Sequence, residues 1–465
     1  MVTAMNAAFI VSIPINWFAV TKYLMLDRRA LSWNFSPVFA MTLPRWLVFA
    51  GNVCAPIGVS ATLLLAGAFP VLQSCLVCLL IAVWLLCKNL RISNHSFLVV
   101  VTIMVLVFVD DGASAASAIS AVLAALYAAA GIAKMNRAYM FGPNSVGKKL
   151  VDLNFSRNSE YLSRTPEWVR RTVHIGAMFV IPAMEISLAA MIMVGVHLVF
   201  CLVTGLVLHF FFGISGNWEF TSVAVSIWLV LILLAESASI SDVISGLAGN
   251  GLSILLYLLC VGLSTALWQC TWQYRSRRAG LVNEIVSAVY FGLASAAAIV
   301  TVENMTFVKM AYPVFFAVLA GTLGAVLVGA RMEFAFAMLS NLRPYGDAWI
   351  FLAPRPLLEP KYFFLRLPNK IPISLFTVVP IQFIKSATSG EFVVHISTAV
   401  SLAKLFRRHG ATLLACRAVP DPDRGRMVLR AESDGPEWVD LSTTRAQCQL
   451  FPPLVPAELA LPVMG

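Results

Sequence analysis

Polar and ionisable side chains inside or beside long apolar stretches are the residues of this sequence whose types could do chemistry. In lipid such side chains are costly, and they usually mark a functional site unless they can reach the headgroups. Six stand out by position: Lys134, His95, Glu185, His174, His209 and Asn217. Each is consistent with a structural role as well as with a role in a site.

Lys134 ends the apolar segment AAAGIAK and is open to two interpretations. One is a lysine at a helix C-terminus whose amine reaches the headgroups and complements the helix dipole. The other is a catalytic base, because a desolvated lysine gives up its proton readily. Gly131, three residues earlier, would let a neighbouring helix or a ligand come close. Taken alone, the residues favour the first interpretation.

Glu185 lies deep in an apolar stretch, where a carboxylate must find a partner or stay protonated. His174 precedes it by eleven residues, which is about three turns at 3.6 residues each, so both are predicted to share one helix face. This spacing indicates a functional site and, equally well, an internal hydrogen bond that joins helices.

His95 and His209 each lie near one end of an apolar stretch. His95, in SNHSF, is consistent with a helix start at the headgroups, capped by Ser93 or Asn94, or with a side chain directed into a helix bundle. His209 opens HFFFGISGNWEF, whose glycines and Asn217 interrupt the apolar pattern. That break predicts an ordinary loop or, if it lies at membrane depth, a pocket lined by irregular backbone.

Long apolar elements must position these side chains. Of the 465 residues, 59% are hydrophobic and 12% are charged, whereas soluble domains carry roughly 25% charged residues. The natural solvent is therefore lipid, and we predict an all-α polytopic membrane helix bundle of nine to eleven spans. The candidate segments are 3–26, 46–69, 70–87, 93–109, 114–134, 172–194, 196–213, 219–238, 250–270, 281–302 and 310–330.

The loop charges predict the orientation of this bundle. The net charge of +10 does not indicate nucleic-acid binding, because the basic residues cluster in short loops beside apolar segments. With eleven spans, one side collects Arg28, Arg29, Arg45, Lys88, Arg91, Arg137, Lys148, Lys149, Arg157, Arg164, Arg170, Arg171, Arg275, Arg277, Arg278 and Arg331. The other side collects Asp110, Asp111, Glu236, Asp242 and Glu303, with Lys309 as its basic residue. The positive-inside rule then predicts a multi-pass cell-membrane protein with its N-terminus outside and its tail in the cytoplasm.

Outside the apolar stretches, two regions are distinctive. The loop 137–171 is polar and basic, and Trp168 beside Arg170 and Arg171 suits an anchor at the headgroups. From residue 341 prolines recur and short β-type runs follow, at 375–379, 391–396, 411–415 and 426–430. We therefore predict a transmembrane domain over 1–340 and a small β-containing extramembrane region over 341–465.

Metal and nucleotide motifs are not convincing. Cys75 and Cys78 have CxxC spacing but lack a second pair or a nearby histidine, so no metal site is predicted among the nine cysteines. GPNSVGKK (142–149) is close to a phosphate-binding loop, but it lacks the Ser or Thr that would hold magnesium and follows an apolar helix rather than a strand.

Several fragments resemble, in order and spacing, the horizontally transferred transmembrane domain family, which includes the vitamin K-dependent gamma-glutamyl carboxylases. The fragments are SNHSF (93–97), AGIAK (130–134) followed by Tyr139 and Gly142, PEWVRR (166–171), HIGAMFVIPAMEI (174–186), HFFFGISGN (209–217) and MEFAFAMLSNLR (332–343). The last is similar to a segment of bacterial members, and the resemblance covers roughly residues 20–345.

The resemblance implies a chemistry for two of the candidates. In the carboxylases a lysine in a stretch similar to AGIAK deprotonates a reduced quinone, and oxygen then reacts so that a strong base forms and a glutamate side chain is carboxylated. Lys134 would be that lysine, and His95 would match a histidine that stabilises the reacting species. The chain departs from the pattern in having Ala133 where the carboxylases have a second lysine, and in its smaller tail.

Two hypotheses for function follow. The first is a membrane enzyme with a lipid-accessible pocket built from His95, Lys134, Glu185 and His209, to which a reduced quinone is the implied cofactor and a peptide or lipid-soluble molecule the substrate. The second is a non-catalytic membrane factor for maturation or export of a secreted peptide, in which the polar residues only join helices. A transporter ranks last, because we see no matching halves with interrupted helices.

Overall fold

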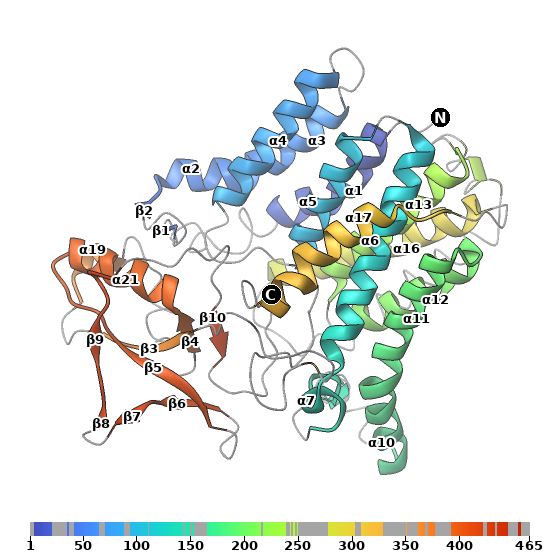
Figure 1. Ribbon diagram of the computed structural model, residues 1–465. Helices are drawn as coiled ribbons and strands as arrows, with labels where there is room; N and C mark the ends of the chain where they lie inside the picture. The colour runs from blue at the N-terminus through green and yellow to red at the C-terminus, as the bar shows by residue number, and fades with distance from the viewer. Residues whose placement is uncertain are drawn as a thin grey trace.

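The computed structural model is mostly helical, with a small antiparallel sheet formed near the C-terminus (Figure 1). It describes residues 4–20, 35–36, 41–64, 70–87, 94–109, 111–142, 145–148, 151–152, 165–214, 217–238, 242, 245–246, 249, 278–302, 308–328, 350, 361–367, 371–376, 392–421, 426–432, 435–444 and 454–456.

The helical part contains α-helices interrupted by three short π-helical segments. In chain order they are α1 (Ala4–Val20), α2 (Arg45–Phe49), η3 (Ala50–Cys54), α3 (Ala55–Leu64), α4 (Pro70–Cys87), α5 (Asn94–Val107), α6 (Gly112–Lys134), α7 (Arg137–Met140), α10 (Glu167–Ile175), η4 (Gly176–Val180), α11 (Ile181–Val194), α12 (Leu198–Ile214), α13 (Trp218–Ala235), α16 (Arg278–Thr301), α17 (Tyr312–Leu319), η5 (Ala320–Gly324) and α18 (Ala325–Val328). The strands β1 (Phe35–Ser36) and β2 (Met41–Thr42) form a separate hairpin.

Among the residues that the structure describes, four helices are long and apolar enough to cross a membrane: Trp46–Leu64, Gly112–Lys134, Glu167–Val194 and Trp218–Ala235. Five further apolar helices are shorter: Val71–Cys87, His95–Val107, Leu198–Gly213, Ile285–Thr301 and Tyr312–Leu327. The prediction of a mostly helical chain with helices that could cross a membrane is confirmed at this level. The prediction of eleven spans is not supported, and the predicted segment 250–270 lies outside the described residues.

Helices α6 and α13 form the centre of the bundle. Within their apolar windows 83% and 89% of the residues are buried, against 33% for Glu167–Val194. Helix α6 packs against α5, α11, α13 and α17, and its many alanines, serines and glycines allow this close approach. A Cβ added at Gly131 would lie 2.6 Å from the Ile186 side chain of α11, so the two helices touch there.

Two of the π-helical segments end shortly before a proline. Segment η3 precedes Pro56 and segment η4 precedes Pro182. Proline removes a backbone donor and its ring crowds the carbonyl four residues earlier, so the regular ladder cannot continue unchanged. A single wide turn re-routes the hydrogen bonds while the helix goes on. As a consequence Glu167–Val194 is one helix whose two ends are out of the ordinary α-helical register.

The C-terminal sheet has the strand order β10-β4-β3-β5-β6, with β9 also paired to β5, and every pairing is antiparallel. Its strands are β3 (Tyr362–Arg366), β4 (Phe392–His395), β5 (Leu414–Asp421), β6 (Arg426–Leu429), β9 (Val439–Asp440) and β10 (Leu454–Pro456), and β7 (Ala431–Glu432) and β8 (Gly435–Pro436) form a hairpin beside it. Helix α21 (Ile396–Arg408) contacts β3 and β4 and shares an apolar core with Phe363, Leu365 and Val394. Tyr362, Phe364 and Val393 are buried in a second cluster with Ala418 and Met427.

The prediction of a β-containing tail is confirmed in part. Strands β4 and β6 fall on the predicted runs 391–396 and 426–430, whereas the run 375–379 begins in the short helix α19 (Ile373–Phe376). The prediction of a strand is wrong for Leu375 and Phe376, because they belong to a single helical turn that follows Pro372; residues 377–379 lie outside the described residues. Ile350, beyond the predicted boundary at 340, pairs with Asn136 and is buried with the helical core.

Candidate functional site

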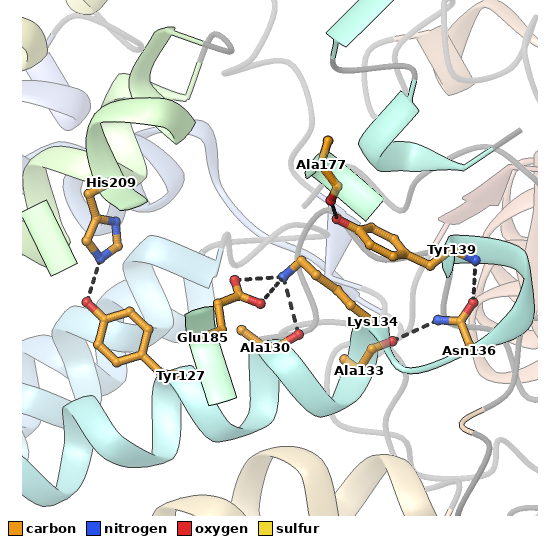
Figure 2. Close-up of polar contacts among 9 residues, drawn as sticks. All are labelled: Tyr127, Ala130, Ala133, Lys134, Asn136, Tyr139, Ala177, Glu185 and His209. Carbon is orange, nitrogen blue, oxygen red and sulfur yellow. Dashed lines mark hydrogen bonds and ion pairs between the residues drawn. The ribbon is translucent and has the colours of Figure 1, made fainter. Parts of the chain in front are cut away.

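A buried ion pair joins α6 to α11. The Lys134 ammonium nitrogen lies 2.8 Å from Oε1 and 2.9 Å from Oε2 of Glu185, and it donates a third hydrogen bond to the Ala130 carbonyl at 3.2 Å (Figure 2). The exposed fraction of each side chain is 2%. An ammonium group has three donors, so all of them are used here. The interpretation of Lys134 as a lysine that reaches the headgroups is therefore wrong, because its amine turns inward to a carboxylate.

The local sequence explains why this pair can form. Gly131 removes the side chain that would hold α11 away, and Pro182 and Ile186 of α11 pack against it. Glu185 thereby comes level with the last turn of α6. Because both side chains are only 2% exposed, each charge depends on the other, and a buried charge without its partner would be strongly destabilising.

His174 does not join this pair. Its Nε2 lies 2.9 Å from Oδ1 of Asp152, and Arg170 lies 3.9 Å from the same carboxylate oxygen. The π-helical segment η4 lies between His174 and Glu185, and its wider turn breaks the 3.6-residue spacing on which a shared face was predicted. The shared face of His174 and Glu185 is therefore not maintained.

His209 anchors a second polar group, one turn of α12 before Phe212. Its Nε2 lies 2.7 Å from the Tyr127 hydroxyl, and the indole of Trp228 donates to that same hydroxyl at 2.7 Å. The Thr221 hydroxyl donates to the His209 backbone carbonyl at 3.0 Å. His209, Tyr127 and Trp228 are all fully or almost fully buried. Helices α6, α12 and α13 are thus tied together by hydrogen bonds.

Phe212 lies between these two polar groups. Its ring centroid is 5.9 Å from the Lys134 ammonium nitrogen and 6.0 Å from the centroid of the His209 ring. Tyr127 and Lys134 are seven residues apart on α6, which places them on the same face two turns apart. Figure 2 shows Glu185 and His209 approaching that helix from two other segments. The structure therefore brings Lys134, Glu185 and His209 into one region.

His95 pairs with Glu219 in the first turn of α13, with Nε2 3.4 Å from Oε2. Helices α5 and α6 are packed neighbours joined by a short connection. Measured along the helix axes at 1.5 Å per residue, His95 lies about 18 Å from the end of α5, and Lys134 lies about 33 Å from the start of α6. His95 is therefore nearer to the level of Tyr127 than to that of Lys134. Phe220, next to Glu219, packs on His209 with ring centroids 5.5 Å apart. His95 therefore belongs with the His209 group rather than with the ion pair.

Asn217 is the N-cap residue of α13, three residues after the end of α12. Its backbone N–H donates to the Phe212 carbonyl, and its own carbonyl accepts from Thr221. These contacts tie the start of α13 to the end of α12, where Phe212 and Phe220 both pack against His209. Within the predicted break in apolar sequence, residues 215–216 lie outside the described residues, Gly213 belongs to the end of α12, and Asn217 caps the start of α13.

Beyond Lys134 the chain turns through a buried polar segment. The Asn136 side chain donates to the Ala133 carbonyl and accepts from the Tyr139 backbone, and the Tyr139 hydroxyl donates to Ala177 in η4 (Figure 2). This segment holds the end of α6 against the π-helical segment η4 and so helps to fix the position of Lys134.

Within the described part of the chain, no group of three His, Cys, Asp or Glu side chains is placed to hold a metal ion. Comparisons with known protein families, with curated proteins and with solved structures found no match for the chain.

Proposed function

We propose that the chain is an integral membrane enzyme in which the buried Lys134–Glu185 pair removes a proton from a hydroxyl group of a reduced, lipid-soluble quinone. The reaction served would be an oxygen-dependent modification of a peptide or of a lipid-soluble substrate. The observation that carries the proposal is the doubly hydrogen-bonded pair itself, with both side chains 2% exposed in a helical membrane bundle. A lysine and a glutamate without solvent are costly to keep, and such residues in membrane segments are usually functional.

The proton balance favours the pair as one basic unit. In the resting state Lys134 is an ammonium group and Glu185 a carboxylate, so the pair is neutral overall. Glu185 receives the proton in either of two ways. It takes the proton directly from the quinol hydroxyl, or it takes one from Lys134, which then takes the proton of the quinol hydroxyl. Lys134 then remains positive beside the oxygen that has lost its proton, and the attraction between these opposite charges is strong at low dielectric. A lone lysine in the same place would lack this acceptor.

Aromatic side chains lie near the pair and near His209, and they would suit a flat aromatic ligand. The Phe212 ring centroid lies 5.9 Å from the Lys134 ammonium nitrogen, and the Phe220 ring packs at a tilt against His209. Apolar pockets with a few polar groups that fix orientation are the usual form of small-molecule sites. A reduced quinone bound there would supply the electrons for a reaction with oxygen, and the chain would supply the base and the shelter from water.

The resemblance to the carboxylase-like family supports the same proposal of a base that acts on a reduced quinone. Lys134 and Glu185 come from two separate fragments that carry the resemblance, AGIAK and HIGAMFVIPAMEI, and their side chains meet. We also propose the multi-pass arrangement with an outer N-terminus and a cytoplasmic tail, which rests on the loop charges.

The experiment uses three variants of the full chain in proteoliposomes: Lys134→Met, Glu185→Met and the double variant. Reduced menadione is the probe, and oxygen uptake is the readout. We expect all three variants to lose uptake above the protein-free background, while the double variant stays folded because no unpaired charge is left.

The matched control is Asn52→Ala, which removes buried contacts from Asn52 to the carbonyls of Val48 and Cys87 at the junction of η3 and α4. It should keep the uptake of the wild type. If the double variant keeps full uptake, or the wild type shows none, the enzyme proposal fails and the non-catalytic maturation factor becomes the better hypothesis.

A further inference from the structure

One nitrogen of His209 is left without a partner in a position that is fully buried. The exposed fraction of the residue is 0%, and Nδ1 has no hydrogen-bond partner among the residues described. The other nitrogen, Nε2, is held by Tyr127 at 2.7 Å. An unpaired polar group is costly in a protein interior, and the cost is higher where lipid rather than water surrounds the bundle.

The neighbouring hydrogen bonds decide which nitrogen carries the proton. The indole of Trp228 can only donate, so the Tyr127 oxygen must accept from it. The Tyr127 hydroxyl then has one proton to donate, and His209 Nε2 is the acceptor within reach. This arrangement satisfies all three groups and puts the imidazole proton on Nδ1. His209 therefore presents a buried N–H donor on the edge of its ring opposite Tyr127 (Figure 2).

Two phenylalanine rings that also contact each other pack against the His209 imidazole. Phe212 and Phe220 lie with ring centroids 6.0 Å and 5.5 Å from that of His209. Across Phe212 lies the Lys134 ammonium group. A ligand that met both the N–H of His209 and the Lys134–Glu185 pair would need a flat apolar body with an oxygen at each end.

We infer that the Nδ1–H of His209 donates a hydrogen bond to an oxygen of the ligand, and that Tyr127 and Trp228 act as positioning residues that hold the imidazole in this tautomer. The ligand class is an aromatic molecule with two opposed oxygens. For its identity the inference rests on the proposed function, which assigns the second oxygen to the Lys134–Glu185 pair.

The test measures binding rather than turnover. Menadione, a naphthoquinone with opposed carbonyl oxygens, is titrated into the detergent-solubilised full chain labelled with ¹⁵N-histidine, and its dissociation constant is obtained by equilibrium dialysis. The chain has six histidines, so the spectrum of His209→Phe assigns the resonances of His209. We expect a protonated Nδ1 whose resonance moves on saturation with menadione, and a dissociation constant raised about tenfold in His209→Phe, the size of one neutral hydrogen bond.

Tyr127→Phe is the matched control for structural damage. It breaks the same Tyr127–His209 contact from the other side but leaves the imidazole in place, so it should weaken binding less than His209→Phe does. Equal binding to His209→Phe and to the wild type, an unmoved Nδ1 resonance, or equal losses in the two variants would overturn the inference. The proposed function fails separately, if the double variant of the ion pair keeps its oxygen uptake.

Discussion

Breaking the Lys134–Glu185 pair from one side should cost far more stability than removing both partners. Lys134→Met leaves a carboxylate at Glu185 with no ammonium group, and Glu185→Met leaves the ammonium group with only the Ala130 carbonyl. Replacing both residues by methionine leaves two apolar side chains of similar length that face each other. The three variants and the wild type form a double-mutant cycle that isolates the interaction.

The geometry sets the size of the effect. Exposed ion pairs are worth roughly 0–1 kcal/mol, but both side chains here are 2% exposed and the contact is made by both carboxylate oxygens. Removing one partner of such a buried pair costs about 3–5 kcal/mol, whereas an apolar replacement of both is close to neutral. We therefore expect each single variant to lose about 3–5 kcal/mol and the double variant to lose about 1 kcal/mol or less.

The assay is unfolding of the full chain in mixed micelles, with increasing mole fraction of sodium dodecyl sulfate and the helical circular dichroism signal as readout. Near-equal midpoints for the wild type and the double variant, with both single variants well below, would support the reasoning. Two single variants that each lose under about 1 kcal/mol would refute it, because the pair would then behave as a solvated one.

Two further predictions concern other parts of the chain. Gly131→Ala should lower the free energy of unfolding by about 1–3 kcal/mol, because its Cβ would lie 2.6 Å from the Ile186 side chain and 3.2 Å from the Pro182 carbonyl. Gly321→Ala, where nothing lies within 4 Å of the added Cβ, is the control. Equal unfolding midpoints for the two variants in the same micelle assay would contradict the close contact of α6 with α11. In the C-terminal sheet, burial lowers the pKa of His395 from 6.5 to about 4. The unfolded chain therefore binds more protons between those values, so the contribution of His395 to stability is complete above pH 6.5 and falls as the pH drops toward 4. His395→Phe should flatten this dependence when thermal unfolding of the full chain is followed by the β-strand signal over a pH series, and an unchanged slope would count against the prediction.

The sequence predicted the elements of the site better than their pairing. Lys134 and Glu185 stood out because ionisable groups are rare in apolar stretches, and that signal needs no structure. Their contact could not be predicted, since it depends on which helix packs against Gly131. Tyr127 was missed, although it is the one aromatic residue of α6 and lies two turns before Lys134 on the same face. That spacing was a usable signal.

Register within helices was the main source of error. The predicted common face of His174 and Glu185 assumed an uninterrupted α-helix, and the π-helical segment η4 removed that assumption. A proline two residues after the segment was visible, but a proline alone does not tell whether a helix kinks, ends or widens. Helix α21 was also missed, although Ile396, Val400 and Ala403 recur at helical spacing before Arg407 and Arg408.

The position of the ion pair also limits how a ligand can reach it. Glu185 lies on the helix Glu167–Val194, of which only 33% is buried, while the Lys134 helix is 83% buried. The helix that carries Glu185 is thus the more exposed partner of the pair, and its neighbour α12 exposes the side chains of Phe200, Val203, Val207 and Phe211. Because both charged side chains are 2% exposed, the proposed lipid-soluble ligand would have to displace side chains around the pair before it met them. An apolar approach of this kind would admit the proposed ligand while it excluded water, and it would keep the electrostatic interaction between the pair and the ligand strong.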